Sequence, residues 1–348
     1  MSTRLYHKLV RNYDLKSILI LILASALFFN YSNFKSQCVS FFEKNKNRND
    51  PIVFIGGFPR SGTTLMRVML DAHPDVRCGE ETRILPNILE TAVTEWIFND
   101  DVSESLLSSG ITKDILDFAI SAFIYEIISR HGKPAKYLCN KDPFLLKHTI
   151  YLSKLFPKSK FILMIRDARG SINSILKRNI RISNFKKDNL IQSFVFWNNA
   201  VETMYSECVS IGIDRCLPVY YEKLVLKPGD EMKRILNFLD IPWDKAVLSH
   251  EKYIGEKISL SKSEKSSDQV IKPVNLLALN EWQENEDILN LLDKLDTFAP
   301  MLKKLGYDSK SNSTNYGEAD LKVISDTLNI KENKQYWDDI ANKLLNPT

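Results

Sequence analysis

The chain has 348 residues, 44% of them hydrophobic, so it is long enough to bury one large core or two small ones, and it shows no internal repeat. Its net charge of +4 is uneven, because the first 50 residues carry +5 and the remainder carries −1. A basic surface for nucleic acid is therefore not indicated, and a single catalytic domain is the simplest organisation.

The N-terminus has the pattern of a membrane anchor. An apolar run over residues 18–29 follows four basic side chains, Arg4, Lys8, Arg11 and Lys16, and precedes a polar stretch. We expect a cytosolic tail at 1–16, an uncleaved signal anchor at 17–31 and a stem at 32–50, which makes a single-pass type II protein with a lumenal catalytic part. Ala24-Ser25-Ala26 resembles a signal-peptidase site, so a cleaved signal peptide is the alternative, although three apolar residues still follow it.

If the catalytic part is lumenal, the five cysteines are expected to form disulfides, because thiols in an oxidising compartment tend to pair. Cys208 and Cys216 are close enough to bridge a turn, and Cys78 could reach Cys139 if the fold brings their segments together. The alternative is that all five are buried thiols; Cys38, in the stem, is left over. Asn312 begins a glycosylation sequon that also suits the lumen.

Beyond the stem, strand-like runs alternate with helical patterns. We predict strands at 52–56, 137–139, 161–165 and 217–221, followed by helices at 63–72, 144–156, 170–179 and 230–239. This order predicts an α/β fold, a parallel sheet flanked by helices, over residues 51–308. Residues 190–210 carry an apolar stripe assigned to core packing, and 309–348 is expected to be a loosely held polar tail whose small apolar face has Leu321, Ile324 and Leu328.

A glycine loop lies between the first strand and the first helix, with Gly57 and Gly62 at the spacing of a Walker A loop. Thr63 stands where that motif has lysine, so an ATPase or kinase is disfavoured. Backbone N–H groups and the helix N-terminus would still bind an anion. Side-chain donors in this loop are Arg60, Ser61, Thr63 and Thr64.

A second anion site is predicted after the strand at 161–165. Arg166 lies at its carboxyl end, and Ser174 and Arg178 are four residues apart on one helix face. Together they could hold a phosphate away from the first loop, as a 3′-phosphoadenosine nucleotide requires. A solvated basic face is the competing interpretation.

At these residues the chain resembles the tyrosylprotein sulfotransferases. The matching segments span roughly residues 50–310 and are collectively specific: Gly57–Arg67, Leu70–Pro74, Arg77–Arg83, Cys139–Pro143, Arg166-Asp167, Tyr220–Glu222 and Ser266–Asn275. The resemblance implies a PAPS-sulfotransferase fold related to P-loop nucleotide-binding folds. It also implies a homodimeric Golgi membrane enzyme that sulfates tyrosines, usually in acidic contexts, of secreted and membrane proteins with 3′-phosphoadenylyl sulfate (PAPS), leaving adenosine 3′,5′-bisphosphate (PAP).

The resemblance also implies roles for individual residues. Glu81 would be the general base, with Arg60, Lys141 and Ser266 as transition-state stabilisers, and the disulfides would be Cys78–Cys139 and Cys208–Cys216. The PAPS-binding residues would be Arg60, Ser61, Gly62, Thr63, Thr64, Arg166, Ser174, Arg178, Tyr221, Ser266, Ser267, Asp268, Gln269, Val270, Ile271, Lys272, Pro273, Val274 and Asn275. One departure is Glu281, where the family usually has a nucleotide-binding lysine.

The chemistry explains these residue types. The tyrosine hydroxyl, with an ordinary pKa near 10, needs a base on its proton as it attacks. Glu80 is a rival to Glu81 that sequence physics cannot rank. An acidic acceptor peptide would need a basic partner, best supplied by Arg83, and main-chain recognition could use the segment with Arg83, Ile84, Leu85, Pro86 and Asn87.

Sulfuryl transfer mainly needs positioning and charge stabilisation, which side-chain cations can supply, so no obligatory metal is expected. Two other functions remain alternatives. A carbohydrate sulfotransferase would share the anion sites but not the Cys78–Arg83 segment, and a lumenal binding protein without turnover would be favoured if Glu281 abolished PAPS binding.

Overall fold

The structure, a computed structural model, describes residues 50–345. Its centre is a five-stranded parallel sheet in the order β2-β3-β1-β4-β5. The strands are β1 (Ile52–Gly57), β2 (Val76–Arg77), β3 (Tyr137–Lys141), β4 (Lys160–Ile165) and β5 (Cys216–Tyr220). The predicted parallel sheet flanked by helices is confirmed, with the short edge strand β2 as an addition. The anchor at 17–31 and most of the stem lie outside the described residues, and within 50–345 no helix is long and apolar enough to cross a membrane.

The strands are buried on both faces, as parallel strands usually are. In β1, Ile52 and Phe54 join one apolar cluster, while Val53 and Ile55 join another on the opposite face. Because successive side chains point to opposite sides of a strand, one short apolar run supplies two cores. The first core includes the stripe of α9 (Leu190–Ile211), where Phe194 and Trp197 are fully buried, so packing is confirmed as the role of that stripe.

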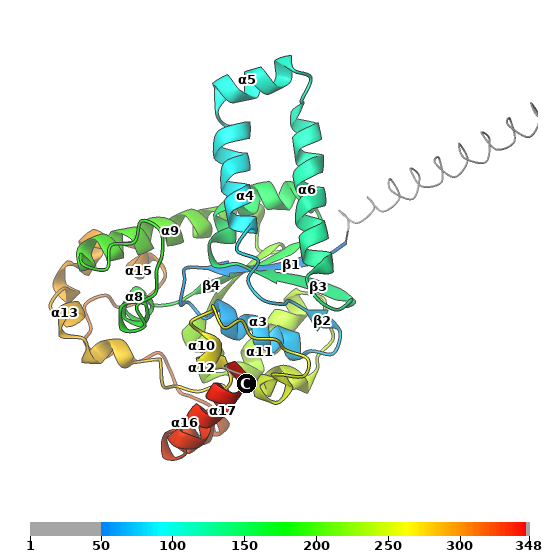
Figure 1. Cartoon of the computed structure of the whole chain (residues 1–348). Coiled ribbons are helices and arrows are strands. Elements are labelled where there is room, and N and C mark those ends of the chain that lie inside the picture. Colours follow the sequence, from blue (N-terminus) through cyan, green and yellow to red (C-terminus); the bar gives the residue numbers. More distant parts are fainter. Residues whose placement is uncertain (1–49, 346–348) are drawn as a thin grey trace, which may run out of the picture. The chain divides into compact units, whose positions relative to one another are not determined.

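Helices cover both faces of the sheet (Figure 1). One core contains side chains of α3 (Thr63–Ala72), α10 (Tyr221–Leu226) and α11 (Pro228–Phe238). The other contains side chains of α6 (Lys113–Arg130), α7 (Thr149–Leu155), α8 (Ala168–Lys177) and α9. The shorter elements are η3 (Pro143–His148), η4 (Lys245–Leu248), η5 (His250–Tyr253), α12 (Ser267–Val270), η6 (Glu281–Glu284), α13 (Glu286–Leu289), η7 (Leu292–Lys294), α14 (Leu295–Phe298) and α15 (Met301–Lys304).

A helical arm extends from the sheet, which the sequence patterns did not lead us to expect. It consists of α4 (Leu85–Thr91), the π-helix η2 (Ala92–Ile97), α5 (Asp100–Ser108) and α6, and Figure 1 shows it projecting beyond the remaining helices. Its base is fixed by buried Leu85 and Leu89, which lie in the same core as Ile124 and Ile128 of α6. The arm thus begins directly after the segment that contains Glu81.

The C-terminal region differs from the loose tail that we expected. Residues 321–345 form α16 (Leu321–Glu332) and α17 (Lys334–Leu345). The small apolar face with Leu321, Ile324 and Leu328 is exposed, and the helix packs through a different face, with Val323, Thr327 and Ile330. Thr327 accepts a hydrogen bond from the backbone N–H of Leu276 at 3.1 Å, so this helix supports the segment that follows residue 266.

Two disulfides join Cys78 to Cys139 and Cys208 to Cys216. These are the pairs implied by the family resemblance. The first links the residue after β2 to the middle of β3, and the second closes the turn between α9 and β5. Asn312, the predicted glycosylation site, is exposed in the loop before α16.

Candidate active site

The glycine loop lies at the carboxyl end of β1, where the chain turns into α3. Gly62 caps that helix with a φ of 94°, in the left-handed region that favours glycine. A Cβ atom added to Gly62 would lie 2.6 Å from the ring of Tyr221, so the close approach of loop and ring also requires glycine. Ser61 Oγ is buried and has no hydrogen-bond partner among the described residues. Ser61 is not in the lining of the adjacent pocket, whereas Gly62, Thr63 and Thr64 at the helix N-terminus are, so these residues are the ones placed to meet an anion.

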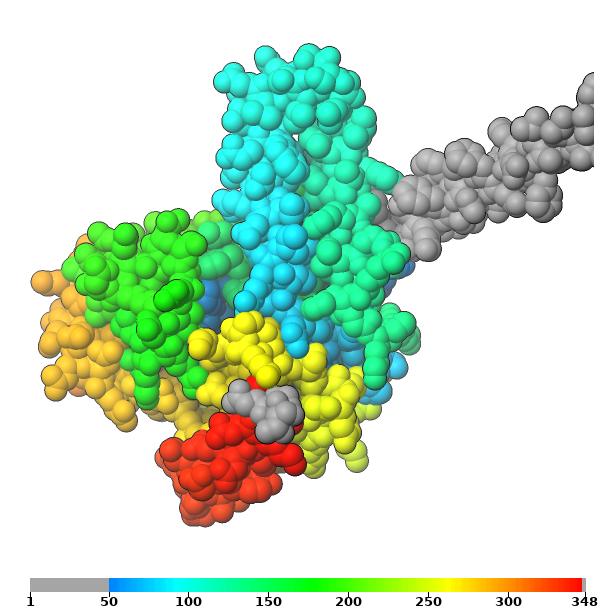
Figure 2. All heavy atoms as spheres, in the orientation of Figure 1, coloured from blue at the N-terminus to red at the C-terminus, as the bar shows by residue number. Residues whose placement is uncertain are grey.

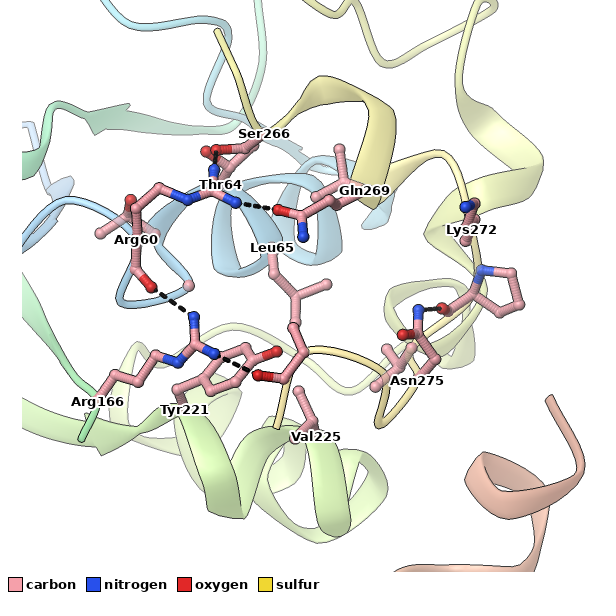
Figure 3. Close-up of a pocket in the computed structure, with 16 residues that line it drawn as sticks. Arg60, Thr64, Leu65, Arg166, Tyr221, Val225, Ser266, Gln269, Lys272 and Asn275 are labelled. Atoms are coloured by element: carbon pink, nitrogen blue, oxygen red, sulfur yellow. Dashed lines mark hydrogen bonds between the residues drawn. The ribbon is translucent and has the colours of Figure 1, made fainter. Parts of the chain in front are cut away.

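Arg60 projects from this loop toward the segment after residue 265. Its Nε donates to Ser174 Oγ at 2.9 Å, and its terminal nitrogens donate to Ser266 Oγ and Gln269 Oε1 (Figure 3). Burial, and then the nearby cations of Arg178 and Arg166, lower the pKa of Arg60 to about 10. Arg60 remains cationic at neutral pH and concentrates positive charge at the mouth of the loop.

Arg166 and Tyr221 complete the floor of the same pocket. Arg166 donates to the backbone carbonyls of Arg60 and Ala278 at 2.9 and 2.6 Å, and its guanidinium stacks over the Tyr221 ring at 4.4 Å (Figure 3). The pocket is also lined by Gly62, Thr63 and Thr64. Ser174 and Arg178 lie outside its lining; Ser174 holds Arg60, and Arg178 pairs with Asp268 at 2.9 Å.

The segment Ser266–Asn275 forms one wall of this pocket, but only part of it faces inward. The lining residues are Ser266, Gln269, Val270, Lys272, Pro273, Val274 and Asn275. Ser267 and Ile271 are buried instead, and Asp268 faces Arg178. Glu281 is not among the lining residues; it pairs with Lys177 at 3.3 Å.

Lys141 lies at the end of β3 and is completely buried. Its Nζ donates to Glu81 Oε1 at 2.5 Å, to Glu264 Oε2 at 2.9 Å and to Thr64 Oγ1 at 3.3 Å. One ammonium group thus connects the glycine loop, the candidate base and a second carboxylate. Sequence reasoning missed Glu264, although it lies two residues before the matched segment Ser266–Asn275.

The pKa values of the two carboxylates around Lys141 are shifted in opposite directions. Burial raises the pKa of Glu81, and the charge of Glu264 adds to that rise against the opposing effect of Lys141. Burial would also raise the pKa of Glu264, but Lys141 and Arg67 together hold it below its ordinary value. Glu264 is therefore the permanent anion, and Glu81 is the carboxylate that binds a proton more readily.

A wider cleft opens on the other side of the glycine loop. Glu81, Arg83, Pro86 and Asn87 line it, while Glu80 lines a separate groove with Arg77. The geometry therefore favours Glu81 over Glu80 as the base for an acceptor in the cleft. Arg83, with a φ of 60°, donates its backbone N–H to Asp142 at 2.9 Å and leaves its side chain half-exposed.

The segment 83–87 does not present an extended main chain. Ile84 is 42% exposed, but Leu85 begins α4 and is fully buried in the core. The carbonyl groups of α4 accept hydrogen bonds within the helix, so pairing with an extended peptide strand is limited to the residues before Leu85, and only N–H groups of the first turn remain as donors beyond it.

The pocket and the cleft meet at four residues that line both: Arg60, Thr63, Thr64 and Ser266. A donor nucleotide in the pocket and an acceptor hydroxyl in the cleft would face each other there. Among residues 50–345 no group of three His, Cys, Asp or Glu side chains is placed to hold a metal ion.

Beneath the nucleotide pocket, Glu222 is buried and accepts the backbone N–H of Asp167 at 3.0 Å and the hydroxyl of Tyr307 at 2.8 Å. Burial raises the pKa of Glu222 to about 7. The folded state therefore holds this proton more tightly than the unfolded chain. The resulting stability is complete below the ordinary pKa of 4.5 and is lost as the pH rises to about 7.

In Glu222→Gln the amide oxygen can accept the Asp167 N–H and the amide NH2 can donate to the Tyr307 hydroxyl oxygen. We therefore expect this variant to raise the free energy of unfolding at pH 8 by about 2 kcal/mol relative to the wild type, and to change it little at pH 4.5. Urea unfolding at both pH values measures this, with the exposed Glu318→Gln as the control. An equal difference between variant and wild type at both pH values would contradict the linkage.

Comparison with known proteins agrees with this geometry. A sequence model of the sulfotransferase family matches residues 51–245, so the chain is a sulfotransferase. It is 49% identical over 302 residues to protein-tyrosine sulfotransferase A of Caenorhabditis elegans, covering 86% of this chain and 78% of the relative. It is also 50% identical over 290 residues to protein-tyrosine sulfotransferase 2 of Gallus gallus, covering 83% and 78%. The chain belongs to the protein-tyrosine sulfotransferase family.

Similarity to solved structures is lower. A sulfotransferase domain from the Synechococcus olefin synthase has 18% sequence identity and a TM-score of 0.48, over 81% of this chain and 95% of that chain. Mouse sulfotransferase SULT7A1 complexed with PAP has 12% identity and a TM-score of 0.41, over 74% and 88%. Family membership rests on the sequence relatives.

Proposed function

We propose that this enzyme transfers the sulfuryl group of PAPS to tyrosine hydroxyls of proteins, with Glu81 as the general base. The observation that carries the proposal is the meeting of the nucleotide pocket and the acceptor cleft at Arg60, Thr63, Thr64 and Ser266, with Lys141 and Glu81 directly beside them. Family membership supports tyrosine as the acceptor.

The pocket suits a nucleotide with phosphates at two positions. The glycine loop, through Arg60, Gly62, Thr63 and Thr64, would hold the 5′-phosphosulfate, and Arg166 with Tyr221 would hold the 3′-phosphate side. Segment Ser266–Asn275 would close over the nucleotide. PAPS, when bound, supplies an activated sulfuryl group.

In the reaction, Glu81 accepts the phenolic proton while the tyrosine oxygen bonds to sulfur and the bond from sulfur to the 5′-phosphate oxygen breaks, leaving PAP. Lys141 and Arg60 stabilise negative charge on the departing and transferring oxygens, and Ser266 adds a neutral donor. Two sets of hydrogen bonds hold these groups, one between Arg60 and Ser266 and the other between Lys141 and Glu81. Lys141 and the glycine loop are connected through Thr64.

Acidic flanks on the acceptor fit the charges of the cleft. Five cations line it, Arg60, Arg83, Lys147, Arg181 and Lys265. Of its four acids, Glu81 and Glu264 are paired with Lys141, which leaves Glu90 and Asp142. Asp142 accepts hydrogen bonds from the Thr82 hydroxyl and from the backbone N–H of Arg83. The excess of cations over acids in the lining would attract acidic side chains next to the tyrosine.

The proposal includes a Golgi location, a type II signal anchor, a lumenal catalytic domain and a homodimer. It is supported by the basic-then-apolar N-terminal sequence, the two disulfides, the exposed sequon at Asn312 and the family resemblance.

The test is incubation of the full chain with PAPS and a peptide that has one tyrosine between acidic residues, with tyrosine sulfate measured by mass spectrometry. Matched peptides carry phenylalanine for the tyrosine, or lysine for the acidic flanks, and a carbohydrate acceptor is assayed in parallel. We expect product from the acidic tyrosine peptide above all. PAP binding without product would indicate a binding protein, and product on the carbohydrate alone would indicate a different acceptor class.

A further inference from the structure

Glu264 occupies an unusual position for a residue in a loop between two surface segments. Its side chain is 2% exposed, and its two oxygens contact three separate elements. Oε1 accepts the backbone N–H of Glu81 at 2.9 Å, and Oε2 accepts Lys141 Nζ at 2.9 Å and Thr64 Oγ1 at 3.4 Å. One carboxylate thus joins the loop after β2, the end of β3 and the first turn of α3.

The loop that carries Glu264 is closed on itself in a way that directs this side chain inward. The backbone N–H of Glu264 donates to Ser261 O at 3.2 Å, and Ser267 donates to Glu264 O and to Ser261 O at 3.0 and 2.6 Å. Directly beyond it, Ser266 and Gln269 accept from Arg60. In Figure 2 this part of the chain, in yellow, lies between the helical arm and the C-terminal helices.

We propose that Glu264 is a positioning residue for sulfuryl transfer, which holds Lys141 and the main chain of Glu81 in place and connects them to the segment that closes over the nucleotide. This inference rests on the proposed function. Glu264 takes one N–H of Lys141, so the ammonium stays between Thr64 and Glu81 instead of turning wholly to Glu81. Its bond to the Glu81 N–H fixes the backbone at the base.

The charge of Glu264 has a separate effect on the proton affinity of the base. The charged groups that face Glu81 are Lys141, Glu264, Asp142 and Arg83, and those that face Glu264 are Lys141, Arg67 and Glu81 itself. His250 lies near Arg67 but is neutral, because burial lowers its pKa to about 4. Glu264 is thus a fixed negative charge that raises the pKa of Glu81 and makes it the stronger base.

Glu264→Gln tests this role, because glutamine has nearly the same shape but no charge and only one acceptor oxygen for three donors. We expect kcat for tyrosine sulfation to fall by about 10- to 100-fold, part of the roughly 10²–10⁴-fold that a positioned base contributes. We also expect the acid limb of the kcat profile to move to lower pH, because Glu81 loses a neighbouring negative charge. The control is Glu256→Gln, an exposed carboxylate eight residues upstream.

A purely structural role would lower activity without moving the acid limb, so an unmoved limb, or a rate equal to that of the control, would overturn the proposal. If Glu264 were itself the base, Glu264→Gln would remove the acid limb while Glu81→Gln stayed active, which would also overturn it.

A second measurement does not depend on turnover. Hydrogen–deuterium exchange of the full chain reports on the Glu81 amide, which we expect to exchange faster in Glu264→Ala than in Glu256→Ala. Equal exchange in both variants would overturn the proposal. If the wild type made no tyrosine sulfate, the proposed function would fail, and this exchange measurement would still decide the role of Glu264.

Discussion

Replacing Glu81 by glutamine is expected to lower kcat for tyrosine sulfation by about 10²–10⁴-fold, the usual contribution of a positioned general base. Glutamine keeps the shape of the side chain but cannot take the phenolic proton. Affinity for PAP should remain unchanged, because Glu81 lines the acceptor cleft and not the nucleotide pocket. Product formation measured by mass spectrometry, together with PAP binding by calorimetry, separates the two effects.

Glu80→Gln is the matched control, since its side chain lies in a different groove. In the wild type, activity should rise with pH through a value above the ordinary range of a glutamate, because burial and then Glu264 raise the pKa of Glu81. Activity of Glu81→Gln close to that of the wild type, or an equal loss in Glu80→Gln, would remove Glu81 from this role.

Lys141→Met is expected to have the second large effect, on both stability and rate. Methionine fills much of the same space but leaves the buried carboxylates of Glu81 and Glu264 without their shared cation. Removing one partner of a buried ion pair typically costs about 3–5 kcal/mol of unfolding free energy. Loss of a preorganised donor should also lower kcat by roughly 10²–10³-fold. Urea unfolding and single-turnover kinetics measure the two quantities.

The stability loss should depend on pH in a defined direction. Without Lys141, burial and mutual repulsion raise the pKa of both carboxylates, so the folded variant binds protons more tightly than its unfolded chain. Its deficit should be largest at neutral pH and shrink on acidification. The double variant Lys141→Met/Glu264→Gln should recover part of the loss at pH 7. A deficit independent of pH, with no recovery in the double variant, would show that packing and not charge explains it.

Much of the sheet could be predicted because its signals are local. Buried parallel strands such as Ile52–Gly57 are continuous apolar runs, and α3 was predicted with its observed bounds, because it follows a strand and a glycine loop. Strand β2, with two residues, has no periodicity to detect. The packing of α16 was not predicted because its packed residues include Thr327, which a hydrophobic pattern does not mark.

The site was predictable only in part, for a related reason. The glycine loop and Arg166 follow strands directly, so topology places them. Glu264 contacts Glu81 across 183 residues of sequence and has no local signature, and its loop is organised by serine hydrogen bonds instead of apolar periodicity. The burial of Leu85, which we had included in a binding segment, was not predictable because it depends on a core shared with Phe54 of β1 and Ile124 of α6, which are distant in sequence.

The Cys78–Cys139 disulfide gives the reaction centre a covalent brace. Cys78 lies three residues before Glu81 and Cys139 two residues before Lys141, and their Cα atoms are 4.1 Å apart. The base Glu81 and its cation Lys141 belong to different elements, but each lies within a few residues of the same disulfide. This disulfide does not involve Ser266–Asn275, the segment that closes over the nucleotide. If that segment moves as nucleotides enter and leave, the distance that Glu81 can move from Lys141 is still limited by the short covalent path through the Cys78–Cys139 disulfide.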